Sequence, residues 1–270
     1  MARTTRTTGT TRTTGTARTR RSTRRALAAV VVVLAAGATA CASADDDEHP
    51  DHRSFGLQGS TLTIDSDDSA LEVVASDTAK AGTVDVTRWF QGSVTVGSSP
   101  KVTWSMKDDR LTLRMHCSGL VADCAAKHRV VVPRGVAVKI DSDDGSVRAQ
   151  GFRDALSVRT KDGSVRVTDS SGPLELRSDD GSVRAEVASR TVNAHTKDGS
   201  VHLTLSAVPD RVESVSDDGS LTIALPAATY RVTTKTDDGG VHVSVPRDES
   251  SAHVVDARSA DGEVTVKNAN

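Results

Sequence analysis

The chain has 270 residues, of which 26% are charged and only 2% aromatic, and its formal net charge is −2. Residues 1–40 contain eight arginines and no acidic residue, so the rest of the chain holds 26 basic and 36 acidic side chains and has a net charge of −10. An acidic protein is poorly suited to bind nucleic acid or anionic lipid through bulk charge. We therefore expect no nucleic-acid partner.

Residues 1–40 predict a signal peptide of the lipoprotein type, because a basic region is followed by a short apolar run at 26–40. That run is too short for an ordinary transmembrane helix. The sequence ATAC ending at Cys41 resembles a lipobox, in which Cys41 would be lipidated and become the mature N-terminus. The sequence TRRAL around Arg24 loosely resembles a twin-arginine signal. An ordinary Sec signal is the other interpretation, and the export route stays open.

These features predict a protein held by its lipid at the outer face of the cytoplasmic membrane. Residues 41–53, which are rich in Asp, Glu and His, are expected to form an acidic tether.

If Cys41 carries lipid, Cys117 and Cys124 remain as an even pair, and a disulfide between them fits an exported protein. His116 and His128 would complete four metal ligands, but the spacing is unlike known zinc patterns, so we predict no metal site.

Residues 54–133 hold four of the six aromatic side chains and several segments of alternating polarity. A stack of strands needs a cap, because its end strand is otherwise unpaired. We expect residues 54–133 to form an N-terminal β cap with irregular coils, pinned by the predicted disulfide. Pro133 and Gly135 then lead into a regular region at 134–270.

The regular region repeats an Asp-Gly turn seven times, at spacings of 18, 18, 18, 20, 20 and 23 residues. A fixed period in this range indicates a repeat architecture. The expected turn residues, all structural, are Asp144, Gly145, Asp162, Gly163, Asp180, Gly181, Asp198, Gly199, Asp218, Gly219, Asp238, Gly239, Asp261 and Gly262.

Two segments of period-2 alternation flank each turn, which is typical of half-buried strands. The fold class predicted is all-β, a parallel β-solenoid with about seven regular coils of 18–20 residues and one coil per repeat. The alternative is a series of antiparallel hairpins, since Asp-Gly is also a strong hairpin signal. The solenoid is favoured because matching positions then stack.

Stacking explains three columns of matching residues. A hydroxyl residue precedes each turn and would bond turn backbone or its neighbours; the column is Ser142, Thr160, Ser178, Thr196, Ser216, Thr236 and Ser259. The glycines would supply positive φ and avoid a Cβ clash. In the first five repeats the residue before the aspartate alternates in charge, as Asp143, Lys161, Asp179, Lys197 and Asp217. Opposite charges such as Asp143 and Lys161 would then face each other on adjacent coils.

The cysteine pair, the sequence HRVVVPRGV starting at His128 and the repeating DGSV units together resemble the bacterial "putative adhesin" domain-of-unknown-function family. The resemblance covers about residues 54–266. It implies an exported β-solenoid lipoprotein at the cell surface, and it implies no catalytic residues.

We find no catalytic motif, and we predict a non-enzymatic protein with no cofactor. The turn aspartates recur by repeat position, whereas catalytic pairs are normally unique. Calcium at some of the turns remains an alternative that the lysines oppose. The outward positions Arg148, Arg166 and Arg184 form a possible ligand stripe.

The predicted function is thus a cell-envelope scaffold or adhesin-like interaction surface whose partner is a cell-wall polymer or envelope protein. The alternative is a polysaccharide-binding or polysaccharide-cleaving β-helix protein.

Overall fold

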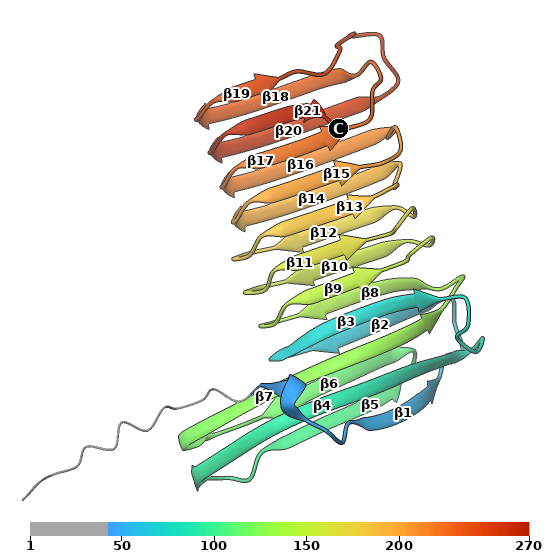
Figure 1. The fold of residues 1–270 in the computed structure, drawn as a ribbon, viewed down its shortest axis with the longest axis vertical. Coiled ribbons are helices and arrows are strands. Elements are labelled where there is room, and N and C mark those ends of the chain that lie inside the picture. The colour runs from blue at the N-terminus through green and yellow to red at the C-terminus, as the bar shows by residue number, and fades with distance from the viewer. Residues whose placement is uncertain (1–42, 270) are drawn as a thin grey trace, which may run out of the picture. The chain divides into compact units, whose positions relative to one another are not determined.

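The computed structural model describes residues 43–269, which contain one short 3₁₀ helix, η1 (Ala44–Asp46), and two large β-sheets. No helix in this part of the chain is long and apolar enough to cross a membrane. The chain alternates between the two sheets, so most repeats place one strand in each (Figure 1).

The first sheet, sheet A, has 11 strands. Their order is β1 (Asp51–Gly56), β4 (Thr83–Gly97), β7 (Gly119–Pro133), β3 (Ser69–Ser76), β9 (Val147–Gln150), β11 (Val165–Thr168), β13 (Val183–Val187), β15 (Val201–Leu205), β17 (Leu221–Leu225), β21 (Val264–Asn268) and β19 (Val241–Val243).

The second sheet, sheet B, has 10 strands. Their order is β18 (Arg231–Asp238), β20 (Val254–Asp261), β16 (Arg211–Asp218), β14 (Thr191–Asp198), β12 (Leu174–Ser178), β10 (Leu156–Thr160), β8 (Ala137–Ser142), β2 (Thr61–Ser66), β6 (Arg110–His116) and β5 (Lys101–Lys107).

The strands of the repeats pair in parallel, with equivalent positions in register. Val165 of β11 lies opposite Val183 of β13, and Leu156 of β10 lies opposite Leu174 of β12. The solenoid prediction is therefore confirmed, and the hairpin alternative is wrong.

The core lies between the two sheets and consists mainly of Val, Leu, Ile and Ala. In β13 the side chains alternate between buried and exposed, and in β12 between buried and half-buried, as period-2 patterning requires. Val165, Leu176 and Leu203 are each at most 1% exposed. Because every coil contributes inward side chains of similar size, the core continues from one coil to the next.

The coils do not all stack in chain order. At the C-terminal end, β20 and β21 lie between the preceding coil, β16 and β17, and the coil formed by β18 and β19. At the N-terminal end, β2 and β3 lie between β6 and β7 on one side and β8 and β9 on the other. The expectation that each copy contacts its neighbour in sequence fails at both places.

The cap is formed by β1 and β4 to β7. β4 and β7 are 15 residues long and pair antiparallel, as do β1 with β4 and β5 with β6. β6 and β7 still pair in parallel with β2 and β3, and beyond them the pairing in the cap is antiparallel (Figure 1).

The described part of the expected tether lies against this cap. The Asp45 carboxylate pairs with Lys127 at 2.7 Å, and Asp47 accepts a hydrogen bond from the Phe90 amide at 2.9 Å. Residues 51–53 are already part of β1. From Ser43 onward the segment is therefore folded rather than a free spacer.

Candidate interaction surface

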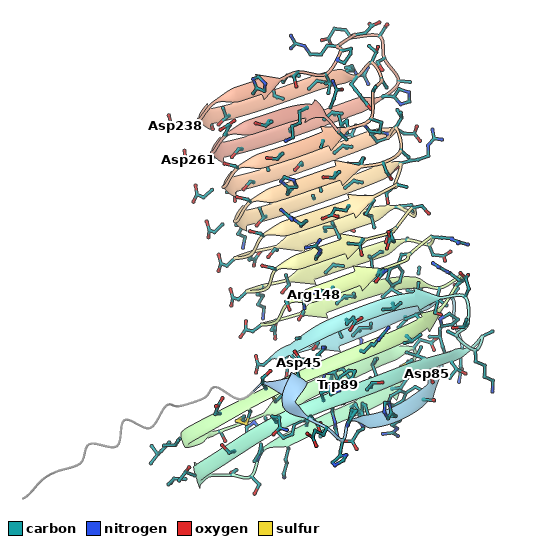
Figure 2. All side chains as sticks on the ribbon, in the orientation of Figure 1. Asp45, Asp85, Trp89, Arg148, Asp238 and Asp261 are labelled. Atoms are coloured by element: carbon teal, nitrogen blue, oxygen red, sulfur yellow. A yellow bond between two sulfur atoms is a disulfide. The ribbon has the colours of Figure 1, made fainter. Side chains whose placement is uncertain are left out.

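The predicted ligand stripe forms one column on the outer face of sheet A. Arg148, Arg166 and Arg184 lie opposite one another in adjacent strands. The column continues through His202, Thr222, Thr265 and His242, in that spatial order. Figure 2 marks Arg148 on this face. Adjacent strands in a sheet are about 4.8 Å apart, so the stripe presents cations at a short, regular interval.

Two arginines of the stripe have no ion-pair partner in the part of the chain that the structure describes. Arg166 is bound to the Glu186 carboxylate at 3.0 Å, whereas Arg148 and Arg184 are exposed and make no salt bridge within the described residues. His202 is half-buried; desolvation lowers its pKa, and the positive charge of Arg184 lowers it further. At neutral pH the stripe therefore offers two unpaired guanidinium groups beside a neutral imidazole.

Shallow hollows lie along the same face. One of about 270 Å³ is lined by Glu72, Arg148 and Arg166, among others. A second of about 630 Å³ lies beside Asp169, Glu186 and Thr204. Most of the residues that line the two hollows are polar or charged.

A second basic column, which was not among the predicted features, lies on the outer face of sheet B. Arg159, Arg177 and His195 lie opposite one another in β10, β12 and β14. Arg177 pairs with Glu175 at 3.0 Å, but Arg159 has no salt bridge in the described structure. The signal was present in the sequence, because Arg recurs at the same position before the turn in two successive repeats.

The seven turn glycines lie in one column at an edge of the stack. A Cβ on Gly181 would collide with the Gly163 carbonyl group, and one on Gly163 would collide with that of Gly145. Only Gly145 of the seven has a positive φ, 150°. Close approach of backbone between coils, rather than the predicted positive φ, is thus the general reason for glycine here.

Six of the seven hydroxyls in the column beside the glycines bond to backbone carbonyl groups at the turns, as predicted, and all but Thr236 are buried. Ser142 is the exception, because its buried Oγ has no hydrogen-bond partner within the described residues. Ser178 donates to the Gly163 carbonyl at 2.9 Å, and Thr196 donates to that of Gly181 at 3.0 Å. Ser216, Thr236 and Ser259 make the equivalent bonds. The hydroxyls therefore tie each turn to the coil below it rather than to one another.

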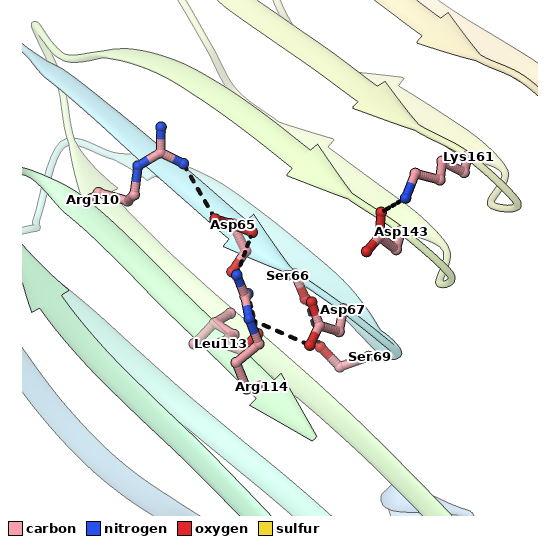
Figure 3. A network of polar contacts seen from close by, with 9 residues as sticks. All are labelled: Asp65, Ser66, Asp67, Ser69, Arg110, Leu113, Arg114, Asp143 and Lys161. Atoms are coloured by element: carbon pink, nitrogen blue, oxygen red, sulfur yellow. Dashed lines mark hydrogen bonds and ion pairs between the residues drawn. The ribbon is translucent and has the colours of Figure 1, made fainter. Parts of the chain in front are cut away.

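The charge alternation before the aspartates also holds. Lys161 binds the Asp143 carboxylate at 2.5 Å (Figure 3), and Lys197 binds that of Asp179 at 3.1 Å. These carboxylates raise the pKa of both lysines, through a hydrogen bond first and charge attraction second.

The turn aspartates themselves form a column of like charge, whose last two members in space, Asp261 and Asp238, are marked in Figure 2. Hydrogen bonding to Asp144 and Asp180 raises the pKa of Asp162, and Asp180 has the same effect on Asp198. Among residues 43–269, no group of three His, Cys, Asp or Glu side chains is arranged to hold a metal ion.

Comparison with known proteins gives the family. The model of the Toastrack DUF4097 family matches residues 41–270. The chain belongs to this family. No curated protein matches it significantly.

A solved structure resembles this Toastrack chain in fold, and a second match has a lower score. A putative adhesin from Bacteroides fragilis has a TM-score of 0.54 and 15% identity, with 83% of this chain and 98% of the other covered. A putative adhesin from Parabacteroides merdae has a TM-score of 0.39 and 10% identity, covering 83% and 97%. The first likeness supports the fold alone, because the identity is low.

The three cysteines of the Toastrack chain fall in different parts of the structure. Cys117 and Cys124 form a disulfide in the cap, as predicted. Cys41 lies outside the described residues. His116 and His128 do not form a metal site with this pair: His116 is exposed beside Ser118, and His128 is fully buried.

Proposed function

We propose that this Toastrack protein is a non-enzymatic cell-envelope lipoprotein that acts as a β-solenoid scaffold and adhesin-like interaction surface. Lipid on Cys41 would hold it at the outer face of the cytoplasmic membrane after export by the Sec or twin-arginine route. The observation that carries the proposal is the register of the stack, which repeats the same outward positions from strand to strand without interruption.

A continuous stack is suited to presenting surface rather than to catalysis. Its exposed side chains sit on strands that are hydrogen-bonded on both sides, so they are held at a fixed spacing. Catalytic groups usually differ from one another in environment. Here the acidic side chains of the turns repeat with similar surroundings from coil to coil.

The ligand we favour for this surface is an anionic polymer of the cell envelope, bound along the stripe of sheet A. Arg148 and Arg184 are exposed and make no salt bridge with residues 43–269, and a hollow lies beside Arg148. A partner of opposite charge would find these cations on a protein that is otherwise acidic. A polysaccharide-binding or polysaccharide-cleaving protein is the second candidate, and the same stripe supports it.

Membrane anchoring is tested by fractionating cells that express the wild-type protein or Cys41→Ala. We expect the wild type to be acylated and membrane-bound and the variant to be released in soluble form. A Cys41→Ala protein that still partitions with membranes would remove the lipid anchor from the proposal.

Ligand binding is tested with immobilised anionic and neutral glycans and polyol phosphates. Arg148→Glu combined with Arg184→Glu should lower the affinity for anionic polymers at least about tenfold, because two favourable contacts become repulsive. Arg159→Glu on sheet B is the matched control, since Arg159 is also exposed and without an ion pair. Equal losses in both variants would assign binding to general charge, and turnover of a glycan would favour the enzymatic alternative.

A further inference from the structure

The cap ends in a projection made by the outer ends of β4 and β7. β3 pairs with β7 only from Ala126 onward, and β1 pairs with β4 only as far as Arg88. Beyond those points the two strands are paired with each other, up to Gly97 and Gly119. We call residues 91–100 and 117–124 the cap tip.

The cap tip exposes large apolar side chains. Leu120 is 85% exposed, Val121 62% and Val96 54%. In the described residues, one other large apolar side chain is comparably exposed, Val241 at 49%, and it lies on the edge strand β19. Three neighbouring exposed side chains therefore concentrate at one place, and such patches commonly mark interaction sites.

The cap tip also lacks charge along most of its length. Residues 91–100 and 117–122 contain no Asp, Glu, Lys or Arg, in a chain where 26% of residues are charged. Lys101 and His116, which pair across β5 and β6, follow directly at its base and are exposed. The Cys117–Cys124 disulfide closes the tip covalently. The one charged side chain of the cap tip, Asp123, lies toward its base, opposite Ser93. An uncharged apolar end with Lys101 behind it suits a lipid surface, with acyl chains beyond the phosphates.

The N-terminal segment reaches the same projection. Going back along the chain, Asp51 lies opposite Arg88 of β4, and Asp47 then binds the Phe90 amide, two residues nearer the tip. Asp45 binds Lys127 of β7, and Figure 2 shows Asp45 and Trp89 close together in this region. Lys127 is seven strand residues from Leu120, which is about 23 Å. Cys41 is two residues before Ser43, a reach of at most about 7 Å.

We propose that the cap tip inserts its apolar side chains into the membrane to which Cys41 is anchored. The inference rests on the proposed lipid anchor, because that anchor brings the tip within reach of a bilayer. A lipid on a short peptide leaves the protein free to rotate, whereas a second contact fixes the orientation of the cap. Leu120, Val121 and Val96 would enter the acyl region, and Lys101 would face the phosphates.

The test uses the mature protein as purified from cells, with Leu120→Trp, reconstituted in phosphatidylcholine and phosphatidylglycerol vesicles whose acyl chains are brominated. Because Leu120 is exposed, its replacement should leave the fold intact, which circular dichroism verifies. Glu249→Trp, in an exposed loop next to the other end of the stack, is the control, and Trp89 and Trp104 contribute equally to both proteins. We expect fluorescence quenching by bromine to be at least about twofold stronger for Leu120→Trp.

Equal quenching of the two proteins would overturn the insertion. Shielding of the introduced tryptophan that depends on protein concentration and not on lipid would assign the tip to a second copy or a protein partner, and would also overturn it. Mass spectrometry of Cys41 separates the two proposals. Quenching without acylation keeps the tip and removes the anchor, whereas acylation without quenching does the reverse.

Discussion

Two buried hydroxyls of β16, those of Ser216 and Ser214, differ in whether they reach a carbonyl oxygen. Ser216 donates to the Gly199 carbonyl at 3.0 Å. Ser214, two residues earlier and fully buried, has no hydrogen-bond partner for its Oγ. Its neighbours in register are Ala194 and Ala257, which offer only methyl groups. Serine therefore stabilises the fold at position 216 and destabilises it at position 214.

We expect Ser214→Ala to stabilise the protein by about 1 kcal/mol, because it removes a buried polar atom that makes no bond. Urea denaturation measures the change in the free energy of unfolding. Ser216→Ala is the control and should cost about 1 kcal/mol, since it removes a hydrogen bond to Gly199. If Ser214→Ala destabilised the fold as much as Ser216→Ala, Ser214 would have to be satisfied by water.

His128 gives the fold a dependence on pH. It is fully buried in the cap and its Nδ1 lies 3.1 Å from the Ser69 Oγ; burial, with a smaller effect of Arg88, lowers its pKa from 6.5 to about 4. In the unfolded chain His128 therefore becomes protonated near pH 6.5, whereas in the folded protein it becomes protonated only near pH 4. The stability contributed by neutral His128 is present above pH 6.5 and is lost as the pH falls toward 4.

Replacing His128 by Leu should flatten this dependence. Between pH 7.5 and pH 4 the wild type should lose about 3 kcal/mol more than His128→Leu, which corresponds to the shift in pKa. Chemical denaturation at several pH values measures both proteins. A difference between them that does not change with pH would contradict the prediction.

At the scale of the coil, the turn column sets how closely coils approach. A Cβ on Gly181 would lie 2.7 Å from the Gly163 carbonyl carbon, which is backbone and cannot move aside. On Gly240 the nearest heavy atom would be the Glu263 Cγ at 3.9 Å. Glycines in two turns of the same kind thus differ in whether a side chain fits.

We expect Gly181→Ala to destabilise the protein by about 2–3 kcal/mol, because the two coils must separate at the turn. Gly240→Ala, the matched control, should change stability by less than about 0.5 kcal/mol. Thermal and urea unfolding measure both. Similar effects of the two substitutions would show that contact with the next coil is not the reason for glycine at position 181.

In the aspartate column, by contrast with the glycine column, we expect a substitution to stabilise the protein. Asp162 lies between Asp144 and Asp180, and hydrogen bonding to these two carboxyl groups raises its pKa. Above that pKa the charge of Asp162 lowers the stability of the folded state, and this stability is regained as the pH falls and the carboxylate is protonated. Asp162→Asn should raise Tm at pH 7 by about 1–2 °C and have no effect near pH 3. Asp210→Asn, which loses the Arg190 ion pair, should lower Tm at pH 7 instead. An Asp162→Asn protein with a lower Tm would contradict the repulsion.

Much of the coil could be predicted from the sequence because its causes are local. Alternation at Val165–Val167 and Leu174–Leu176 places side chains in or out whatever the neighbouring coil is, and the predicted Lys161–Asp143 pair follows from stacking alone. The reason for glycine at 163 was predicted only in part, since the position of the Gly145 carbonyl requires the actual packing of two turns. The basic column at Arg159 and Arg177 was visible in the pattern but was not predicted, since the predicted stripe contains only positions on the strand after each turn.

At the scale of the whole described region, the order in which the coils stack could not be predicted from the sequence pattern. Repeats that are nearly alike can stack on one another in any order, so periodicity does not say which coil is last. The sequence held one indication of the order. The longest spacing, 23 residues, separates Gly239 from Gly262, where the chain returns to lie between two earlier coils. The consequence is that the C-terminal coil, β20 and β21, is internal and is paired on both edges.

This order predicts an unusual response to truncation. In a stack built in chain order, removing the last coil exposes the one before it and leaves the rest intact. Here, deleting residues 253–270 removes the strands on which β18 and β19 rest, and also the contact of His253 with Tyr230. We expect residues 229–246 then to unfold and to become sensitive to protease, while the preceding coils stay folded.

Deleting residues 229–246 instead is the matched control, because it removes a similar length from nearer the middle of the chain. β20 and β21 would still pair with β16 and β17, so this internal deletion should remain folded to its C-terminus. Limited proteolysis with mass spectrometry compares the two proteins. The coil order would be wrong if the C-terminal deletion were the resistant one, since β18 and β19 would then have to rest directly on β16 and β17.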